Sequence, residues 1–237
     1  MPFAYYGAKH KMARYYSPPE FGTIVEPFAG SAAYSVRHAR NVDRVILIEK
    51  DPAVVDLWNR IMTTGAESLD DVDRILRDET RTTDPLLGAL AGGSTLRTTL
   101  AGTSVAITPW MREHWPWVRA RIARTMPYLH RFEICNGSYE SSQNIEATWF
   151  IDPPYKTDSN AAHVAGNAYR ESQSNIDYRH LAEWSQERLG HVIVCEQMPA
   201  DWLPFRPFRG QNNAVNTRKT EVVWEKSHYR HELVVNA

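Results

Sequence analysis

The four residues Asp152-Pro153-Pro154-Tyr155 carry the clearest chemical signal in the chain, because they come directly after the apolar run Thr148–Ile151. Two consecutive prolines fix the backbone φ and remove two amide donors, so the chain leaves such a strand in a stiff, extended turn. In open α/β sheets ligands bind at the carboxyl ends of the strands, which is where this turn would lie. A carboxylate and the Pro153 carbonyl can accept two N–H groups of a flat amino-heterocycle while the Tyr155 ring stacks on it. The alternative interpretation is a proline-capped loop in which Asp152 caps a helix.

A second signal is the segment Glu26-Pro27-Phe28-Ala29-Gly30 at the end of the first apolar run. A glycine turn lets a ligand approach the backbone, and the helix that follows offers free N–H groups. Glu49 ends the next apolar run about twenty residues after Gly30, where an acid commonly binds ribose hydroxyls. An ordinary βα turn and a solvated strand-end charge explain these two features equally well. The N-terminal Tyr5-Tyr6-Gly7-Ala8-Lys9, taken alone, is a basic, aromatic surface arm.

The composition is that of a globular protein of 237 residues, with 27 Lys and Arg against 28 Asp and Glu and a formal net charge of -1. Such a length suits one sizeable domain with an insertion better than two independent domains. No apolar run approaches the length of a membrane span, and the first residues lack a signal-peptide core, so we expect no membrane association. Cys135 and Cys195 form no disulfide framework, which fits a reducing cytoplasm. The nine histidines show no metal-ligand spacing, so no metal site is expected.

Short apolar runs that do not alternate in polarity predict strands buried on both faces of a parallel sheet. These runs are Thr23–Glu26, Arg44–Glu49, Thr148–Ile151 and His191–Cys195, with further strands expected at Arg131–Ile134 and Glu221–Trp224. Helix-like stretches lie between the runs, at Ser31–Ala39, Pro52–Met62 and Asp177–Leu189. Strands that alternate with helices indicate an α/β fold with helices on both faces of the sheet.

The stretch 64–128 differs from the rest, because it has no buried-strand signal and contains a Gly/Ser/Thr-rich segment followed by a Trp- and Arg-rich one. We therefore predict a small, mainly helical inserted subdomain there, with 1–63 and 129–237 forming the main domain. The charge is divided unevenly, since Asp43–Asp84 carries eleven acids and six bases, whereas Arg97–Arg131 carries six arginines and one acid. Near-neutrality of the whole chain thus conceals a basic insertion.

Taken together, these segments resemble the Dam-like class of DNA adenine-N6 methyltransferases, which use S-adenosylmethionine. The family's Y-x-G-x-K, E-P-F-x-G and D-P-P-Y motifs are similar to Tyr5–Lys9, Glu26–Gly30 and Asp152–Tyr155, in the same order along the chain. Its R-x-K-x-x-E-type last strand is similar to Arg209–Val223, so only the insertion is weakly matched. The resemblance implies a Rossmann-like methyltransferase sheet, S-adenosylmethionine as the cofactor, and the insertion as the target-recognition region.

The resemblance assigns catalysis to Asp152, Pro153 and Tyr155, whose carboxylate, carbonyl and ring would hold the N6 amine. It assigns cofactor binding to Tyr6, Gly7, Lys9, Glu26, Pro27, Phe28, Gly30, Glu49, Ser138, Tyr139 and Asp152. Two of these depart from the family's pattern, because Ser138 stands where an acid is usual and Tyr139 where Phe is usual. A hydroxyl or carbonyl accepts the hydrogen bond of the cofactor's adenine amino group more weakly than a carboxylate does. The family's F-N-x-P-F/Y-G-like recognition motif is also absent, so no target sequence can be carried over.

Double-stranded DNA is the partner that the resemblance implies, and N6 inside a duplex is reached only when the base is flipped out. Candidate DNA-binding residues are Arg97, Arg112, Arg119, Arg121, Arg124, Arg218 and Lys219. The tryptophans of the insertion, Trp110, Trp115 and Trp117, are expected to form its small core rather than a stacking surface. The segment Lys156–Asn175, with Tyr169, is a candidate lid over the extruded base, and a surface loop explains it equally well.

Other functions remain open beside this one. The same fold and cofactor act on cytosine N4 or on adenine in RNA, and D-P-P-Y does not separate these substrates. A non-catalytic nucleic-acid-binding relative and a nicotinamide dehydrogenase are the other classes, and the missing G-x-G-x-x-G argues against the dehydrogenase. We further expect a monomeric, cytoplasmic protein that associates with the nucleoid, is encoded by a bacterium or a phage, and is of the kind found in restriction–modification.

Overall fold

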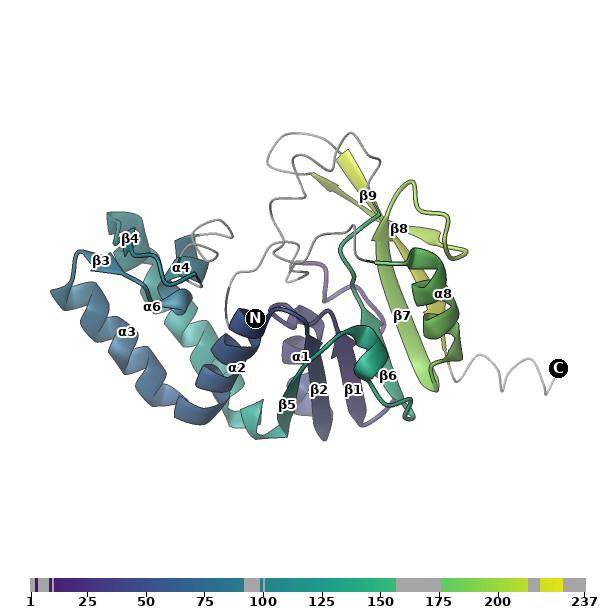
Figure 1. Ribbon diagram of the computed structural model, residues 1–237, viewed down its shortest axis with the longest axis horizontal. Helices are drawn as coiled ribbons and strands as arrows, with labels where there is room; N and C mark the ends of the chain where they lie inside the picture. The colour runs from purple at the N-terminus through teal and green to yellow at the C-terminus, as the bar shows by residue number, and fades with distance from the viewer. Residues whose placement is uncertain are drawn as a thin grey trace.

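The computed structural model describes residues 3, 9, 11–91, 99, 101–156, 176–212 and 218–227. These residues form a seven-stranded sheet in the order β5-β2-β1-β6-β7-β9-β8 (Figure 1). Its strands are β1 (Thr23–Pro27), β2 (Arg44–Glu49), β5 (Phe132–Asn136), β6 (Ala147–Ile151), β7 (Gly190–Gln197), β8 (Arg206–Asn212) and β9 (Arg218–Lys226). The first five of these in the sheet order are parallel, and β9 and β8 close one edge as antiparallel strands.

The helices are α1 (Ala33–His38), α2 (Pro52–Thr64), α3 (Ala66–Asp78), α4 (Pro85–Ala91), α6 (Pro109–Thr125) and α8 (Tyr178–Glu187). Short 3-10 turns are η1 (Ala39–Asn41), η2 (Met126–Arg131) and η3 (Tyr139–Ser141). Two of the predicted starts are capped as expected, because Asp51 accepts a hydrogen bond from the Ala53 amide at 3.0 Å and Asp177 accepts one from the Arg179 amide at 2.9 Å.

Neighbouring residues of each central strand point into different cores, which is why the strands are apolar without alternation. In β1, Ile24 belongs to the cluster that contains α1 and α2 residues, whereas Val25 belongs to the cluster that contains α8 residues. In β6, Phe150 and Trp149 divide in the same way. The sheet is therefore covered by helices on both faces, and the predicted Rossmann-like α/β fold is confirmed.

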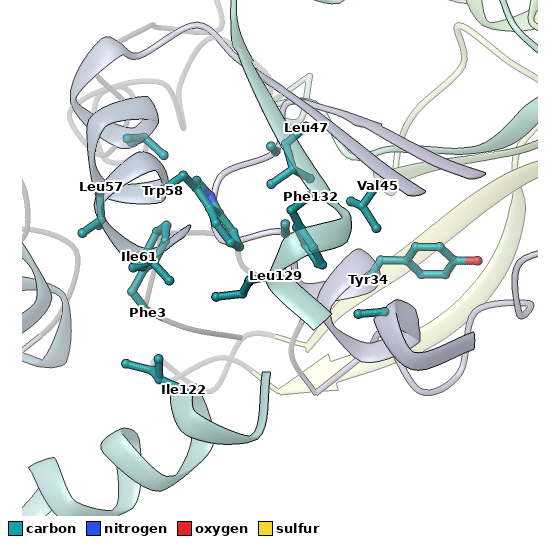
Figure 2. Packing of buried hydrophobic residues seen from close by; sticks show 14 of the residues in the cluster. Phe3, Tyr34, Val45, Leu47, Leu57, Trp58, Ile61, Ile122, Leu129 and Phe132 are labelled. Carbon is teal, nitrogen blue, oxygen red and sulfur yellow. The ribbon is translucent and has the colours of Figure 1, made fainter. Parts of the chain in front are cut away.

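Trp58 of α2 lies at the centre of the larger core (Figure 2). Its ring meets Phe3 edge-on at a centroid distance of 5.6 Å and stacks near Phe132 at 5.9 Å. The buried indole donates a hydrogen bond from Nε1 to the Gly30 carbonyl at 2.7 Å. The core of the sheet thereby fixes the position of the loop after β1.

Between α2 and β5 the chain forms α3, α4, α6 and a small antiparallel pair, β3 (Arg81–Thr82) and β4 (Val105–Ala106). In Figure 1 these helices lie to the left of the sheet, beside α2. Buried residues of this region, among them Val72, Leu87 and Trp115, belong to the same continuous cluster as the residues around Trp58. The inserted region therefore has no core that is separate from that of the sheet.

The structure differs from the sequence-based expectations at the tryptophans of the insertion and at strand β8. The insertion's tryptophans do not form one core, because Trp115 is buried while Trp110 and Trp117 are 46% and 64% exposed. Strand β8 was not anticipated, since its polar sequence with Pro207 and Gly210 lacks an apolar run. Among the described residues, no helix combines the length and apolar character needed to cross a membrane.

Candidate functional site

The Asp152–Tyr155 turn follows β6 directly, and the Glu26–Gly30 segment begins at the end of β1. These two strands are parallel neighbours in the sheet, with Ile24 opposite Thr148 and Val25 opposite Trp149. On one side of β1 the chain continues outward to β2, and on the other side lies β6, so the strand order reverses here. The carboxyl edge at such a reversal is the usual ligand site of open α/β sheets.

A largely buried cluster of charged and phenolic side chains includes two residues of the turn, Asp152 and Tyr155. Lys9 Nζ lies 2.8 Å from Asp152 Oδ1, 3.9 Å from Glu221 Oε1 and 4.4 Å from the centroid of the Tyr155 ring. The Tyr155 hydroxyl donates a hydrogen bond to Glu221 Oε1 at 3.1 Å, and the Tyr16 hydroxyl donates to the same oxygen. We call Lys9, Asp152, Tyr155, Glu221 and Tyr16 the Lys9 cluster.

The Lys9 ammonium and the two carboxylates of this cluster stabilise one another's charged forms, which offsets the effect of burial. Burial by itself lowers the pKa of the Lys9 ammonium, but the carboxylates of Asp152 and Glu221 outweigh it and hold the pKa above its ordinary value. Burial raises the pKa of Asp152 to about 6, with Lys9 acting in the opposite direction and Glu221 adding to the rise. Near neutral pH the cluster therefore contains a charged Lys9 and an ionised Asp152.

Two further side chains fix the backbone of the turn. Glu196, a fully buried residue of β7, accepts hydrogen bonds from the Lys156 amide and from Trp202 Nε1, both at 3.0 Å. Its burial raises the pKa of the Glu196 carboxyl to about 7. The Tyr178 hydroxyl donates a hydrogen bond to the Pro154 carbonyl. The Pro154 carbonyl is thereby engaged within the fold, while the Pro153 carbonyl is the acceptor that the sequence assigned to a ligand.

The loop after β1 is sharply turned, with positive φ angles of 62° at Phe28, 48° at Gly30 and 45° at Ala32. Left-handed backbone at a residue with a Cβ costs about 1–2 kcal/mol, so surrounding contacts must impose it at Phe28 and Ala32. The Ala29 amide donates to the Ile48 carbonyl at 3.1 Å, which ties the loop to β2. Backbone strain held in this way is common where a loop is shaped for a ligand.

Glu49, predicted to bind ribose hydroxyls, is buried at the end of β2 and braces the loop. Its Oε2 accepts a hydrogen bond from the Gly30 amide at 2.8 Å, and its Oε1 accepts one from the Asp51 amide at 2.9 Å. Burial raises the pKa of Glu49, and the backbone donors of Asp51 and Gly30 counteract that rise. Each carboxylate oxygen can accept a second hydrogen bond, so bracing the loop leaves room for a hydroxyl donor.

Glu26, another predicted cofactor residue, points into the protein. It is buried, and its Oε2 accepts hydrogen bonds from both the amide and the hydroxyl of Ser35 in α1. Burial raises the pKa of Glu26 to about 8, against the effect of the Ser35 donors. Near neutral pH Glu26 is therefore mostly protonated, and its contacts join the end of β1 to the first helix.

An aromatic pair marks the far side of the loop, where Phe28 and Tyr139 stack at a centroid distance of 5.4 Å. The Tyr139 hydroxyl lies 2.8 Å from His180 Nδ1 of α8, and burial raises the pKa of Tyr139 to about 12. Ser138, where an acid was expected, donates a hydrogen bond from its hydroxyl to Glu140 Oε2 at 3.0 Å. A carboxylate is thus present two residues beyond the expected position, which the motif comparison did not detect.

The predicted DNA-binding arginines have unequal surroundings. Arg119 pairs with Asp70 at 2.7 Å and with Asp73 at 2.9 Å, and Arg112 donates to the Glu79 carbonyl at 2.9 Å.

Arg121 and Arg124 are placed differently from Arg119. The Arg121 guanidinium lies 4.5 Å above the ring of exposed Trp117, and its Nε has no hydrogen-bond acceptor among the described residues. Arg124 is exposed in the last turn of the same helix. The face of α6 that carries Trp117, Arg121 and Arg124 repeats at helical spacing, because these positions are four and three residues apart.

Other predicted site residues lie outside the described part of the structure. These are Tyr6, Gly7 and Arg97, the side chains of Arg218 and Lys219, and the candidate lid apart from Lys156, including Tyr169. Within the described ranges no group of three or more His, Cys, Asp or Glu side chains is arranged to hold a metal ion.

Three residues of the site were missed in the sequence. Glu221 was part of the R-x-K-x-x-E-type segment, but nothing in that pattern predicts a contact with the Asp152–Tyr155 turn. Tyr16 and Glu196 belong to no motif, and their roles follow only from packing. In the sequence each is a polar residue within or next to an apolar stretch, and many residues that have no part in a site fit the same pattern.

Comparison with known proteins adds little to this geometry. No protein-family model and no curated protein sequence matches the chain. Thirteen chains of solved structures match it. One is the crystal structure of a proposed methyltransferase from Pseudomonas syringae. Its sequence identity is 10% and its TM-score 0.40, with 92% of this chain and 96% of that chain covered.

Proposed function

We propose that this chain transfers a methyl group from S-adenosylmethionine to N6 of an adenine that is flipped out of duplex DNA. The observation that carries the proposal is the Lys9 cluster at the carboxyl edge of the sheet, where Lys9 contacts both Asp152 and the Tyr155 ring. The four Dam-like motifs lie far apart in the sequence. In the described residues Lys9, the last residue of the Y-x-G-x-K motif, contacts Asp152 of D-P-P-Y, and the Gly30 amide of E-P-F-x-G donates a hydrogen bond to Glu49.

The residues around the β1 loop fit S-adenosylmethionine in chemistry. The left-handed backbone at Phe28 and Gly30, the Glu49 carboxylate and the Phe28–Tyr139 pair offer an open turn, a hydroxyl acceptor and aromatic faces. When bound, S-adenosylmethionine supplies an electrophilic methyl group whose sulfur departs as a neutral thioether. No metal is needed for that chemistry.

The turn after β6 would act on the amine. The adenine N6 lone pair is delocalised into the ring, and hydrogen bonds from N6 to the Asp152 carboxylate and the Pro153 carbonyl favour a pyramidal nitrogen with the lone pair directed outward. The Tyr155 ring would hold the base by stacking. Lys9 keeps Asp152 ionised, so that this carboxylate can accept an N–H group and then the proton that N6 loses. Most of the rate enhancement then comes from orientation and electrostatic stabilisation.

For DNA binding we propose the face of α6 that carries Trp117, Arg121 and Arg124. Its guanidinium groups complement phosphate, and an exposed tryptophan adds an aromatic surface. Arg119, which is neutralised by two aspartates of α3, fits a role in holding α6 against α3. A monomeric protein acting in the cytoplasm on the nucleoid remains part of the proposal.

The test is transfer of labelled methyl groups from S-adenosylmethionine to unmethylated plasmid DNA, with the Asp152→Ala variant as control. We expect incorporation with the intact protein and a loss of at least about a hundredfold with the variant. Label in cytosine, or in RNA but not DNA, would favour the alternative substrates, and no incorporation would leave a nucleic-acid-binding relative. Equal incorporation by Asp152→Ala would exclude the assigned site.

A further inference from the structure

Glu221 has no place in the proposed chemistry, yet it contacts three members of the Lys9 cluster. It lies in β9, opposite Gln197 of β7, and only 5% of it is exposed. Its Oε1 accepts hydrogen bonds from the Tyr155 and Tyr16 hydroxyls and lies 3.9 Å from Lys9 Nζ. A carboxylate buried to this degree is costly unless such partners offset the loss of water.

We propose that Glu221 is a positioning residue, which holds the Tyr155 ring in its stacking orientation by accepting the Tyr155 hydroxyl. The inference rests on the proposed function, because it assigns a purpose to the orientation of that ring. Tyr155 is joined to the turn at its Cα end, and Glu221 holds the opposite end of the side chain. A ring held at both ends loses less rotational freedom when a base stacks on it.

The position of β9 makes this role physically reasonable. Tyr155 and Glu221 are 66 positions apart in the sequence, and the antiparallel pairing of β9 with β7 places Glu221 next to the carboxyl ends of the parallel strands. Lys9 lies close to both Asp152 and Glu221, so the Glu221 carboxylate also limits where the Lys9 ammonium can lie. The antiparallel edge of the sheet thus provides an anchor for the turn after β6.

A second carboxylate of the same strand offers a matched control. Glu225 is also nearly buried, at 10% exposed, and accepts hydrogen bonds from His191 at 3.1 Å and Arg206 at 2.7 Å. Glutamine keeps a side-chain carbonyl that can still accept the Tyr155 hydroxyl, so leucine, which has no acceptor, is the replacement at both positions. Glu225→Leu removes a nearly buried, hydrogen-bonded carboxylate from β9 without touching the Lys9 cluster. Any effect that comes only from weakening β9 should be shared by Glu221→Leu and Glu225→Leu.

The first arm of the test measures unfolding in urea and needs no activity. We compare Glu221→Leu, Tyr155→Phe and the double variant, and expect the two changes to couple by at least about threefold in the unfolding equilibrium constant. Glu225→Leu combined with Tyr155→Phe should be additive. Additive effects for Glu221 and Tyr155 would show that the hydrogen bond does not hold the ring, and would overturn the inference whether or not the protein is a methyltransferase.

The second arm measures labelled-methyl transfer to unmethylated plasmid DNA. We expect Glu221→Leu and Tyr155→Phe each to lower kcat about tenfold with KM for DNA within about twofold, and the double variant to be no worse than the lower single variant. Glu225→Leu should keep kcat within about twofold. Wild-type transfer with no loss in Glu221→Leu, or an equal loss in Glu225→Leu, contradicts the positioning role. Absence of transfer by the wild-type protein contradicts the proposed function instead.

Discussion

Replacing Lys9 by Met removes the single positive charge recorded within 4 Å of Asp152 among the described residues, with little change in side-chain length. The variant leaves the partly buried Asp152 and the buried Glu221 carboxylates near one another without the shared ammonium. Without Lys9, desolvation and the repulsion between the two carboxylates both favour the protonated form of one of them. Because a protonated Asp152 accepts an N–H group more weakly and cannot take the proton that N6 loses, we expect the loss of activity to depend on pH.

The size of the effect follows from the geometry. A unit charge 2.8 Å away contributes about 6 kcal/mol at an effective dielectric constant of about 20, which is a ceiling. Opposite charges at such distances lower carboxyl pKa values in proteins by about 1–3 units. Removing Lys9 therefore raises the pKa of Asp152 from about 6 to between about 7 and about 9. At pH 7 its ionised fraction falls by about twofold at the lower limit and about ninetyfold at the upper limit.

The assay measures initial rates of methyl transfer at saturating cofactor and DNA between pH 5.5 and pH 9.5. Wild-type activity should fall on the acid side with a midpoint near pH 6, and Lys9→Met should show the same fall about 1–3 pH units higher. Activity of the variant should then recover toward the wild-type level at the alkaline end. Lys9→Arg keeps the charge and should keep the wild-type midpoint. A deficit in Lys9→Met that is unchanged at pH 9.5 would refute the idea that Lys9 acts by keeping Asp152 ionised.

Two further predictions concern Glu26 and the face of α6. The pKa of Glu26 is raised in the folded protein to about 8, so its contribution to stability is present below the unfolded value of 4.5 and is lost as pH rises through 8. The free energy of unfolding of Glu26→Gln, measured in urea relative to that of the wild type, should therefore rise by about 3 kcal/mol between pH 5.5 and pH 8.5. A difference between the two proteins that does not change with pH would contradict the buried, protonated state. Replacing Arg121 and Arg124 together by Ala should weaken DNA binding and reduce its salt slope by about 2, measured by fluorescence anisotropy. Arg119→Ala should lower the free energy of unfolding by up to about 1 kcal/mol and leave the salt slope of DNA binding unchanged. A reduced salt slope in Arg119→Ala, with an unchanged slope in the double variant, would show that the face of α6 with Arg121 and Arg124 does not bind DNA.

The sequence predicted the parts of the fold that are dictated by local composition. The apolar runs at Arg44–Glu49 and Thr148–Ile151 became central strands, because strands buried on both faces need continuous apolar sequence. Strand β8 was missed because an edge strand can be polar and can contain proline. Its presence depends on pairing with β9 rather than on its own residues.

The site could be predicted as a set of segments but not as a network. The Asp152–Tyr155 turn, Glu49 and Lys9 were found because each carries a recognisable residue type at a strand end or in a motif. Glu221 contacts Tyr16, which is 205 residues away in the sequence, and Tyr155, which is 66 residues away. No local sequence pattern specifies contacts between residues so far apart. The same limit applies to Trp117, whose exposure depends on which face of α6 packs on the core.

Methylation of adenine N6 in DNA by the Asp152–Tyr155 turn and the Lys9 cluster can be measured in a host that lacks DNA methylation. The protein is expressed there, the host DNA is digested to nucleosides, and methylated bases are identified by mass spectrometry. We predict N6-methyladenine with the wild-type protein and its absence with Asp152→Ala at equal expression. N4-methylcytosine in place of N6-methyladenine, or no methylated base with a folded wild-type protein, would show that the chain is not an adenine-N6 methyltransferase.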